Sequence, residues 1–581
     1  MKKYYIGLSI TYHDSALAII NDQGEVLFAE ATERYMQYKR AVNCEPDSLN
    51  RISDLLLKYC DSESEFIVAF NWNNRRPLYE AVCTRLNYFT PSGLMRKRFN
   101  QYAAFIEKYK IFHMLASQIK SMRSGGINLA RKIREDLPKS TVSFLHFDHH
   151  LTHAAAGCYG SAFGDAACIV VDSYGERGAM AFYHYKNNKV ELISELKGMQ
   201  SPGFFYMKLT ELCGFDWLKG EEWKVMGLAA YGRQNEEVFA LFKAMITIEG
   251  CGFSQNLDQI RSGVHRIEQL KNSATETFLA DLAYTGQYFY TGLITKILNN
   301  FFELGFSSNL ILSGGCALNS SFNGQILQQT PFTSLHVPPA PADDGTALGA
   351  AFLAYYKANP TASTRRQIVS PYLGSKMSVN TAERIITMGK MSGSKQFSDR
   401  IYRKTAKLLS QGKLVGWIQG KAEFGSRALG NRSILADPRD PLMKDKINQL
   451  VKFREHFRPF APSILHEFGD EYFESYQESP YMERTLKFRA DVIVKVPAVV
   501  HVDNTGRLQT VKREWNRPFY DLIQEFHQIT QIPLLLNTSF NVMGKPIVHS
   551  VEDAVGVFMT SGLDALVIDD YLFVKPGVES L

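Results

Sequence analysis

Histidines crowd into one short stretch of the chain, 146-HFDHHLTHAAAG-157, at positions 146, 149, 150 and 153. His149 and His153 are four positions apart, so on a helix both imidazoles lie on one face with Cβ atoms about 5–6 Å apart. Two rings at that separation can share one metal ion. The same spacing also fits two surface or capping histidines on an alanine-rich helix, so the spacing alone leaves both interpretations open.

Two aspartates favour the metal. Asp172 ends a predicted strand and Asp343 lies at a glycine-rich helix start, and we expect both to face the same cleft. Asp344 takes the place of Asp343 if this interpretation is shifted by one residue. Two imidazoles and two carboxylates with open coordination positions favour iron(II) (Fe²⁺), with Mg²⁺, Mn²⁺ and Zn²⁺ as alternatives, and would let the ion bind substrate oxygens.

A repeated strand unit would position these residues. The sequence predicts a strand meander at 3–10, 15–20 and 25–31, and a second copy at 167–172, 179–185 and 190–196. In both copies the first strand ends in a short polar turn, HDS in one and DSYG in the other. Duplicated lobes that face each other across a cleft would explain this pattern.

Two glycine-bearing turns follow the second unit. The stretch 309–327 runs from a strand through Gly314 and Gly315 into a helix pattern, and 338–356 opens a helix just after two aspartates. Exposed amides at a helix start suit a phosphate, although each turn taken alone is a weak signal.

The chain divides after these turns. Pro, Ser and Thr accumulate around 359–376, so we predict a first domain at 1–360, a linker at 361–370 and a second domain at 371–581. The second part carries strand-like runs at 413–420, 492–502 and 532–541 and a helix pattern at 401–412, which indicate an α/β domain.

Cationic side chains gather in this second domain. The stretches 421–439 and 452–459 contain two dense groups interrupted by aromatics: Arg427, Arg432, Lys452, Arg454 and Arg458. Ser539 and Asn541 follow at a predicted strand end. Arginine forks bind phosphate or carboxylate groups in two-pronged fashion, so the pattern predicts an anionic, phosphate-containing ligand.

Bulk properties exclude several classes. A length of 581 residues predicts two or three folded domains, and the eight cysteines are scattered without a CxxC pair, as in reduced cytoplasmic proteins. We expect no secretion signal, no membrane span and a cytoplasmic location. The basic segment 96–134 could meet nucleic acid, but it is better explained as amphipathic helices, and a net charge of +6 is small for a nucleic-acid-binding protein.

Ten motifs in order carry a resemblance to a known family: GLSITYHDSALAII, ERYMQYKR, HHLTHAAA, VVDSYGERG, KGEEWKVMGLAAYG, LSGGCALN, DDGTALGAA, EFGSRALGNRSILADPR, FREHFRPFAPSIL and LNTSFN. The chain resembles the O-carbamoyltransferases of antibiotics and nodulation factors, such as those of tobramycin and cephamycin, nearly end to end. The resemblance implies an α/β protein with a duplicated actin-like ATPase (ASKHA) domain, similar to threonylcarbamoyl-transferring proteins, followed by a YrdC-like domain.

The resemblance also implies an activity and its partners. Carbamoyl phosphate and ATP would give carbamoyl-adenylate in the C-terminal domain, and the carbamoyl group would pass to a hydroxyl of a small-molecule natural product in the N-terminal cleft. Nucleic acid and membrane are not expected as partners, and a homodimer is left open.

Site residues follow from the same resemblance, position by position. The metal ligands would be His149, His153, Asp172 and Asp343. The carbamoyl-phosphate pocket would be Arg427, Lys452, Arg458, Arg507, Ser539 and Asn541, with Lys452 and Ser539 also catalytic. The nucleotide loop would be Ser313, Gly314, Gly315 and Asn319 together with Asp343. His13 and Lys39 would lie near the transfer site, His13 as a base for the acceptor hydroxyl or as a structural residue.

The sequence departs from the family pattern in two places. Ser426 stands where the family usually has proline, and 33-ERYMQYKR-40 lacks the usual paired glutamates ahead of the arginine. The second departure and the basic segment lie where we expect the acceptor to bind, so the acceptor is not identified. Two other functions remain as alternatives: a tRNA threonylcarbamoyl-transferase, and a nucleotide-dependent interaction protein with a structural metal.

Overall fold

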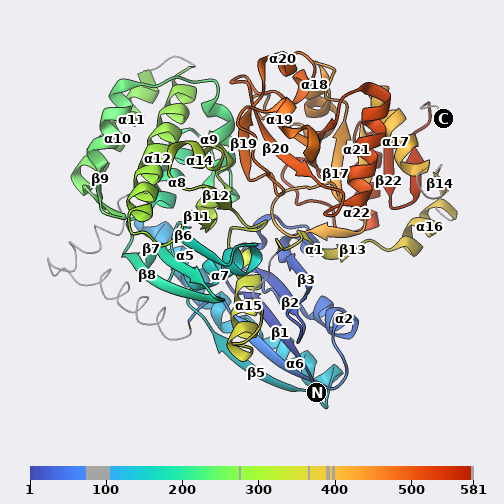
Figure 1. Cartoon of the computed structure of the whole chain (residues 1–581), viewed down its shortest axis with the longest axis horizontal. Coiled ribbons are helices and arrows are strands. Elements are labelled where there is room, and N and C mark those ends of the chain that lie inside the picture. The colour runs from blue at the N-terminus through green and yellow to red at the C-terminus, as the bar shows by residue number, and fades with distance from the viewer. Residues whose placement is uncertain (74–104, 274–276, 364–366, 388–392, 396–399, 578–581) are drawn as a thin grey trace. The chain divides into compact units, whose positions relative to one another are not determined.

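The computed structural model describes the chain except for residues 74–104, 274–276, 364–366, 388–392, 396–399 and 578–581 (Figure 1). Part of the predicted basic segment and part of the predicted linker lie outside the described residues. The chain forms two compact units. Unit 1 contains residues 1–32, 40–319 and 325–369, and unit 2 contains residues 33–39, 320–324 and 370–581.

The first sheet of unit 1 has five strands in the order β3-β2-β1-β4-β5. Their bounds are β1 Lys2–Ser9, β2 Ala16–Ile20, β3 Val26–Ala31, β4 Ser64–Phe70 and β5 Thr141–His146. The meander β1-β2-β3 is antiparallel, whereas β4 and β5 add in parallel on the other side of β1.

The second sheet repeats this topology. Its order is β8-β7-β6-β11-β12, with bounds β6 Asp165–Val171, β7 Gly178–Lys186, β8 Lys189–Lys197, β11 Asn309–Ser313 and β12 Ser334–His336. The meander is again antiparallel and the last two strands are again parallel to the first. The predicted repeat of a three-strand unit is therefore confirmed, and it extends to five strands.

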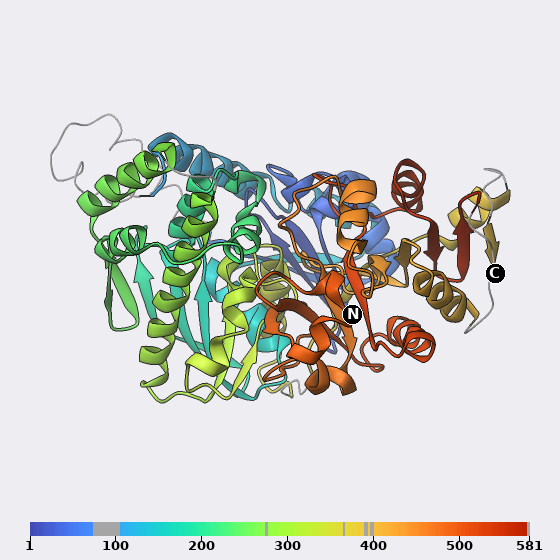
Figure 2. The same cartoon turned by 90° about the horizontal axis from the view of Figure 1, so that it is seen from above.

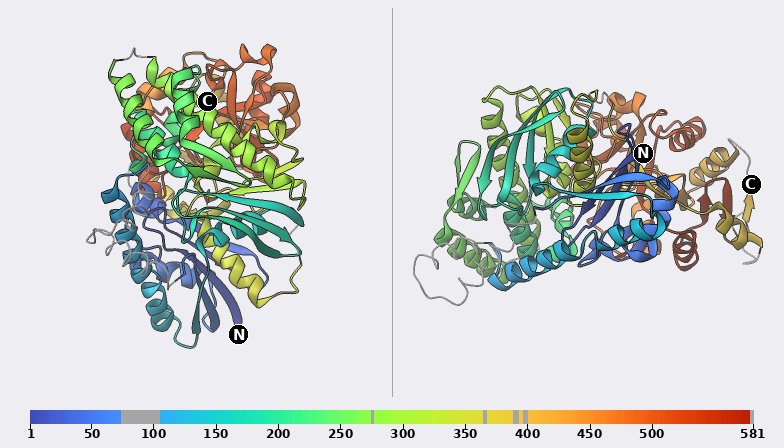
Figure 3. Two further views of the ribbon diagram at one scale, coloured as in Figure 1. Left: turned by 90° about the vertical axis from the view of Figure 1, so that its left-hand side faces the viewer. Right: turned by 90° about the horizontal axis from the view of Figure 1, so that it is seen from below.

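Two helices occupy matching places in the repeat. Helix α7 (His149–Gly160) follows β5, and helix α15 (Gly345–Ala358) follows β12. The helices pack against each other, and α15 also runs along β1 and β2 (Figures 1 and 3). Glycines permit this closeness: a Cβ on Gly349 would lie 1.9 Å from the Thr152 carbonyl oxygen, and one on Gly7 would lie 1.8 Å from that of Ala347.

The described part of the basic segment 96–134 forms helices, one of which packs on the first sheet. Helices α2 (Leu49–Tyr59) and α6 (Ile127–Asp136) place Leu56, Leu129 and Ile133 in the core of this sheet. Helix α5 (Lys108–Ser124) precedes α6. Two cations of α6 pair with acids of the same helix: Arg131 with Glu135 at 2.6 Å and Lys132 with Glu135 at 3.0 Å. Over its described part, the segment forms amphipathic helices as expected.

A second group of helices belongs to unit 1 and is drawn in green in Figure 2. These helices are α8 Pro202–Leu212, α9 Glu222–Ala229, α10 Glu236–Met245, α11 Leu257–Ser273 and α12 Phe278–Phe302. Shorter elements are η1 Lys39–Ala41, η2 Trp217–Lys219, η3 Gly315–Leu318, α14 Ile326–Gln329 and the hairpin β9 Ile246–Glu249 with β10 Gly252–Gln255.

Unit 2 is built on a nine-stranded sheet in the order β14-β23-β22-β15-β17-β21-β18-β20-β19. The bounds are β14 Gly393–Lys395, β15 Val415–Ile418, β17 Arg432–Ala436, β18 Ala461–Leu465, β19 Arg484–Lys487, β20 Thr505–Val511, β21 Leu534–Ser539, β22 Ala565–Ile568 and β23 Tyr571–Val574. A separate pair joins β13 Tyr372–Lys376 to β16 Lys421–Glu423.

The remaining elements of unit 2 are α1 Thr32–Met36, α13 Ser320–Asn323, α16 Val379–Thr387, α17 Arg400–Ser410, α18 Met443–Ile447, η4 Asn448–Lys452, η5 His466–Phe468, α19 Gly469–Tyr472, α20 Ala490–Ile493, η6 Pro497–Val499, α21 Arg517–Thr530 and α22 Val551–Thr560. Helices α17 and α21 pack together and bury apolar faces. The mixed helices and strands confirm an α/β fold.

One predicted strand is wrong. Residues 492–502 form helix α20 and the turn η6 in place of a strand, although their sequence is rich in valine. Pro497 begins η6, and a proline has no N–H group to donate to a neighbouring strand, so it favours the turn. Among the described residues, no helix is both long enough and apolar enough to cross a bilayer.

Candidate functional site

Helix α7 brings two of the predicted ligands to one face. Asp148 caps the helix by accepting a hydrogen bond from the Leu151 N–H at 3.2 Å, which fixes the first turn at His149. The rings of His149 and His153 are perpendicular, with centroids 4.7 Å apart, and both side chains are 1% exposed. The helical interpretation of this stretch is therefore confirmed.

Two carboxylates complete the group. Asp172 directly follows β6, and Asp343 lies just before α15. The four ligand atoms all lie within 4.8 Å of one another. Asp172 Oδ2 is 3.5 Å from His149 Nε2 and 3.9 Å from His153 Nε2. Asp343 Oδ1 is 3.6 Å from His149 Nε2 and 3.3 Å from His153 Nε2. We call these four residues the His/Asp cluster.

The His/Asp cluster fits a metal ion. Ligands held about 2.0–2.2 Å from one ion lie roughly 3–3.5 Å from one another, close to the observed separations. The Nε2 atoms of both histidines are buried and make no hydrogen bond with the part of the chain that the structure describes. Buried imidazole nitrogens without a partner are costly, and a shared ion would satisfy both at once.

The glycine turn after β11 orients one ligand. The Gly315 N–H donates to Asp172 Oδ1 at 3.2 Å, which leaves Oδ2 for the histidines. Gly314 has a φ of 93°, and a Cβ there would lie 2.3 Å from the Val171 carbonyl oxygen. The Ser313 hydroxyl donates to the His153 carbonyl at 2.9 Å. The predicted nucleotide loop therefore lies directly beside the His/Asp cluster.

Asn319 ends this loop and is held from α12. Its side-chain amide exchanges hydrogen bonds with the buried Gln287 at 3.0 and 3.3 Å. The segment from Gly314 to Asn319 is thus fixed at both ends.

Charge within the cluster is strongly coupled. Burial disfavours a charged His149, but the carboxylates of Asp172 and Asp343 outweigh burial and raise its pKa to about 9. Burial alone would raise the pKa of Asp172 and of Asp343, but the histidines lower both. His150 points elsewhere: burial and the charge of His149 lower its pKa to about 4, and it is not part of the cluster.

His13 lies at the edge of this cluster. Its Nδ1 is 2.9 Å from Asp14 Oδ2 and 3.6 Å from Asp343 Oδ2. Arg40 binds the same Asp14 oxygen through Nε at 3.2 Å and Nη2 at 3.0 Å. Asp14 has a φ of 53°, a strained value for a residue other than glycine. The side chain of Lys39 is exposed, and this residue belongs to unit 2.

Sequence reasoning missed Glu176. Its Oε1 accepts hydrogen bonds from the N–H groups of Asn73 at 2.7 Å and His149 at 3.3 Å, although the carboxyl is almost fully buried. Burial and the charge of Asp148 raise its pKa to about 7. The residue lies in the quoted motif VVDSYGERG, whose glutamate could have been singled out as the acid nearest to the Asp172 turn.

A different group forms the candidate pocket of unit 2. Lys452 is buried at the end of η4, and its ammonium donates to the Ser539 carbonyl, to the Asn541 carbonyl at 3.0 Å and to Asn541 Oδ1 at 2.7 Å. The Ser539 hydroxyl donates to Asn541 Oδ1 at 2.8 Å. Burial and the charges of Arg454 and Arg458 lower the pKa of Lys452 well below its usual value.

Arginines surround this lysine. Burial and the charges of Arg427, Arg454 and Arg458 lower the pKa of Arg507. Burial lowers the pKa of Arg427 to about 10, and burial together with Arg458 lowers that of Arg454 to about 9. We call Arg427, Lys452, Arg454, Arg458 and Arg507 the cation cluster. Such crowded positive charge is stabilised when an anion binds.

Arg432 does not belong to the cation cluster. Its guanidinium is fully buried and donates to the backbone carbonyls of Gln419, Asn431, Ser375 and Gly420. The sequence placed it among the ligand-binding arginines, but both of its terminal nitrogens are bonded to backbone carbonyls of the fold.

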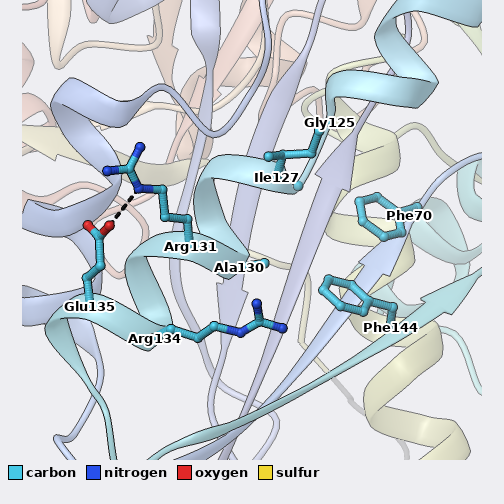
Figure 4. Close-up of a pocket in the computed structure, with 9 residues that line it drawn as sticks. Phe70, Gly125, Ile127, Ala130, Arg131, Arg134, Glu135 and Phe144 are labelled. Carbon is cyan, nitrogen blue, oxygen red and sulfur yellow. Dashed lines mark hydrogen bonds and ion pairs between the residues drawn. The ribbon is translucent and has the colours of Figure 1, made fainter.

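A hollow of about 550 Å³ lies elsewhere on unit 1, and none of its lining residues belongs to the His/Asp cluster (Figure 4). Figure 4 shows the rings of Phe70 and Phe144 on one side of it and Arg131, Arg134 and Glu135 of α6 on the other.

Comparisons with known proteins identify the family of the chain. The family model for the carbamoyltransferase N-terminus matches residues 4–352, and the model for the carbamoyltransferase C-terminus matches residues 406–575. The chain is 30% identical to an uncharacterized protein of Synechocystis sp., over 98% of this chain and 97% of that protein.

Nodulation proteins are also relatives. Nodulation protein NolNO of Sinorhizobium fredii is 35% identical over 77% of this chain and 66% of that protein. Nodulation protein NolO of Bradyrhizobium diazoefficiens is 35% identical over 74% of this chain and 79% of that protein. The crystal structure of T.kodakarensis HypF is 12% identical over 63% of this chain and 49% of that chain, with a TM-score of 0.32. The chain belongs to the carbamoyltransferase family and is an enzyme of the O-carbamoyltransferase type predicted from its motifs.

Proposed function

We propose that this carbamoyltransferase works in two ATP-dependent steps and acts on a hydroxyl group of a small molecule. Unit 2 would form carbamoyl-adenylate, and unit 1 would transfer the carbamoyl group. In this proposal residues 1–360 have an actin-like ATPase (ASKHA) fold, and residues 371–581, after the linker 361–370, have a YrdC-like fold. The observation that carries the proposal is a buried cation cluster, in which Glu455 pairs with Arg458, in a chain that also holds a separate His/Asp cluster.

The first step uses the cation cluster. Carbamoyl phosphate would bind between its arginines, with Lys452, Ser539 and Asn541 around the carbamoyl end. Water would cleave carbamoyl phosphate to carbamate and phosphate, and a carbamate oxygen would attack the α-phosphorus of ATP and expel pyrophosphate. Fixed cations stabilise the charge that develops on the departing phosphate, and they need no rearrangement to do so.

The second step uses unit 1. The acceptor hydroxyl would attack the carbamoyl carbon, AMP would leave, and the hydroxyl proton would pass to a base. His13 is the candidate because its Nδ1 is fixed by Asp14, which leaves Nε2 to accept a proton. His149, His153, Asp172 and Asp343 would hold a divalent ion, preferably Fe²⁺, which supplies positive charge for the adenylate's oxygens. The turn from Ser313 to Asn319 would contact the nucleotide.

Pyrophosphate release tests the first step. The purified full-length protein is incubated with ATP and carbamoyl phosphate without any acceptor, and pyrophosphate is measured. We expect release that requires both substrates and that falls at least tenfold in Lys452→Ala and Ser539→Ala, because each removes a group placed in the pocket. Lys487→Ala, which removes a half-exposed surface lysine paired with Glu474, is the matched control. Release that is insensitive to both pocket variants would contradict the pocket.

Metal content tests the second site. We expect the double variant His149→Ala, His153→Ala to lose its bound divalent metal, measured by elemental analysis, while pyrophosphate release persists. The variant should no longer transfer the carbamoyl group to acceptors. Unchanged metal content in the double variant would show that the ion, if present, is held elsewhere.

A further inference from the structure

Many hydrogen bonds within unit 2 hold the loop that carries Arg427. Glu423 lies just before the loop, and its Oε1 accepts hydrogen bonds from the N–H groups of Leu429 at 2.7 Å, Asn431 at 2.8 Å and Arg432 at 3.2 Å. One buried carboxylate oxygen therefore closes the loop from inside.

Side chains from outside the loop hold its carbonyl groups. Four carbonyls accept such bonds: Ala428 from Asn537 at 3.2 Å, Leu429 from Tyr372 at 2.8 Å and Gln509 at 2.9 Å, Gly430 from Trp417 at 2.9 Å, and Gly425 from Arg34 at 2.6 Å. The first three carbonyls are held by residues of the C-terminal half of the chain. The fourth is held by a residue from the far N-terminal part.

Arg34 makes this bond from inside unit 2. Its side chain is 2% exposed, and the Glu33 carboxylate is 4.0 Å from its Nε. Its Nη1 is buried and makes no hydrogen bond with the described residues. The segment is also pinned by Gln37, whose amide donates to the carbonyls of Arg34 at 2.7 Å and Ile547 at 3.0 Å. A guanidinium buried with so little compensation lowers the stability of the fold.

A second short segment, 320–324, packs on the frame of the same pocket. The Ser320 and Thr485 hydroxyls are 3.0 Å apart, and the Asn323 amide donates to the Glu483 carbonyl at 2.9 Å. A Cβ on Gly324 would lie 2.0 Å from the Thr485 carbonyl oxygen. Thr485 is paired across β19 and β20 with Arg507, so this segment supports the strand pair that carries a second arginine of the cation cluster.

We propose that Arg34 and Gly324 are positioning residues for the anion pocket of unit 2. Arg34 sets the position of the Arg427 loop through Gly425, and Gly324 allows segment 320–324 to lie against the strand pair that carries Arg507. Neither residue contacts the ligand in this proposal. The inference rests on the proposed function, because the ligand whose binding it affects is carbamoyl phosphate.

The geometry explains why such distant support matters. Gly425 is two residues before Arg427 and has a φ of 112°, so a shift of its carbonyl moves the arginine directly. Several arginines must converge on one phosphate, and a displacement of about 1 Å of one binding group reduces productive binding by up to roughly 100-fold. Residues 33–39 and 320–324 would therefore be parts of the pocket's frame, although they precede residue 370.

Binding of carbamoyl phosphate to the full-length protein, measured by calorimetry without ATP, tests the proposal. We expect Arg34→Met to weaken binding roughly 10- to 100-fold, and Arg34→Lys to recover part of the loss because lysine can still donate one hydrogen bond. Gly324→Ala should weaken binding by a similar factor, since its methyl group would displace Thr485.

Two matched control variants separate an effect on the pocket from a general loss of folding. Arg489→Met removes an exposed arginine that donates to the Asp470 carbonyl at 2.7 Å in the same unit, and Gly556→Ala adds a methyl group in α22 where no atom lies within 4 Å. Both should bind carbamoyl phosphate like the unsubstituted protein. Circular dichroism melting of each variant gives the folded fraction, and affinities are compared per folded molecule.

The outcomes distinguish the two proposals. If the unsubstituted protein does not bind carbamoyl phosphate, the proposed function fails. If it binds, and both Arg34→Met and Gly324→Ala bind equally well per folded molecule, the positioning role is overturned. If Arg34→Lys binds no better than Arg34→Met per folded molecule, a hydrogen bond to the Gly425 carbonyl does not set the affinity, and the loop-positioning role is again overturned.

Discussion

Replacing Arg507 with methionine should change stability and ligand binding in opposite directions. The arginine is surrounded by three other arginines, and burial together with their charges lowers its pKa. Its Nε is buried and makes no hydrogen bond with the described residues. In the absence of a ligand, this side chain therefore destabilises unit 2, and methionine can fill much of the same volume without the charge.

The size of the effect follows from Coulomb's law. Two unit charges about 4–8 Å apart at an effective dielectric constant of 20 repel each other by roughly 2–4 kcal/mol. Lost packing and partial solvent screening reduce the gain, so we expect Arg507→Met to raise the free energy of unfolding by about 1–2 kcal/mol. For a unit of this size, that corresponds to a rise of roughly 2–8 °C in the melting temperature.

The ligand should reverse which of the two proteins has the higher melting temperature. Carbamoyl phosphate at 100 times its dissociation constant stabilises the unsubstituted protein by about 2.7 kcal/mol. If the substitution weakens binding roughly 100-fold, through loss of charge-assisted hydrogen bonds, the same concentration stabilises the variant by only about 0.4 kcal/mol. Without the ligand the variant should melt at the higher temperature, and with saturating ligand the unsubstituted protein should.

Scanning fluorimetry across a carbamoyl phosphate titration measures both effects, with Arg489→Met as the control. A variant that melts lower than the unsubstituted protein without ligand would refute the electrostatic argument. A variant that keeps the full ligand-induced shift would remove Arg507 from the pocket.

Three further predictions concern unit 1. Gly349→Ala should destabilise the fold by about 1–3 kcal/mol and lower metal affinity, because its methyl group would clash with the Thr152 carbonyl between α7 and α15. Urea unfolding and metal titration measure the two effects. Gly292→Ala, with no atom within 4 Å of the added methyl group, is the control and should change neither. Glu176 has a pKa of about 7 in the folded protein against an ordinary 4.5, so metal-free protein should lose roughly 3 kcal/mol of stability as pH rises from about 4.5 through 7. Urea unfolding at several pH values measures this loss, and Glu176→Gln should remove the pH dependence. Asp14→Asn should lower kcat for carbamoyl transfer at least tenfold and leave pyrophosphate release unchanged, since asparagine lacks the negative charge of the carboxylate that holds Nδ1 of the neighbouring histidine. Equal loss of both activities would contradict this role.

Local patterns made the strands of unit 1 predictable. Each meander strand is a short β-branched or apolar run bounded by a turn, so the repeat could be found from the sequence. The packing of α15 on β1 and β2 was not predictable, because it depends on glycines whose neighbours are distant in the chain. In the valine-rich segment 492–502, local β propensity gave a wrong strand prediction, because Pro497 begins a turn there.

The candidate site divides in the same way. His149 and His153 are on one turn of helix, and their spacing could be read directly. That Asp172 and Asp343 join them depends on where two separate strands end, which the motifs suggested but spacing could not establish. Arg432 resembled its neighbours in sequence, and only its four carbonyl partners reveal a structural role. Nothing in local sequence marks Arg34 as part of a pocket near residue 427.

The bond between Arg34 and Gly425 has a consequence for synthesis on the ribosome. The two residues are 391 positions apart, and translation at about 5–20 residues per second separates their emergence by roughly 20–80 seconds. During this interval, the nascent chain carries segment 33–39 without the partner that buries it. A premature stop before residue 425, or early release of the chain, should therefore leave an aggregation-prone N-terminal product. We expect chaperones to bind the nascent chain until residue 425 has emerged.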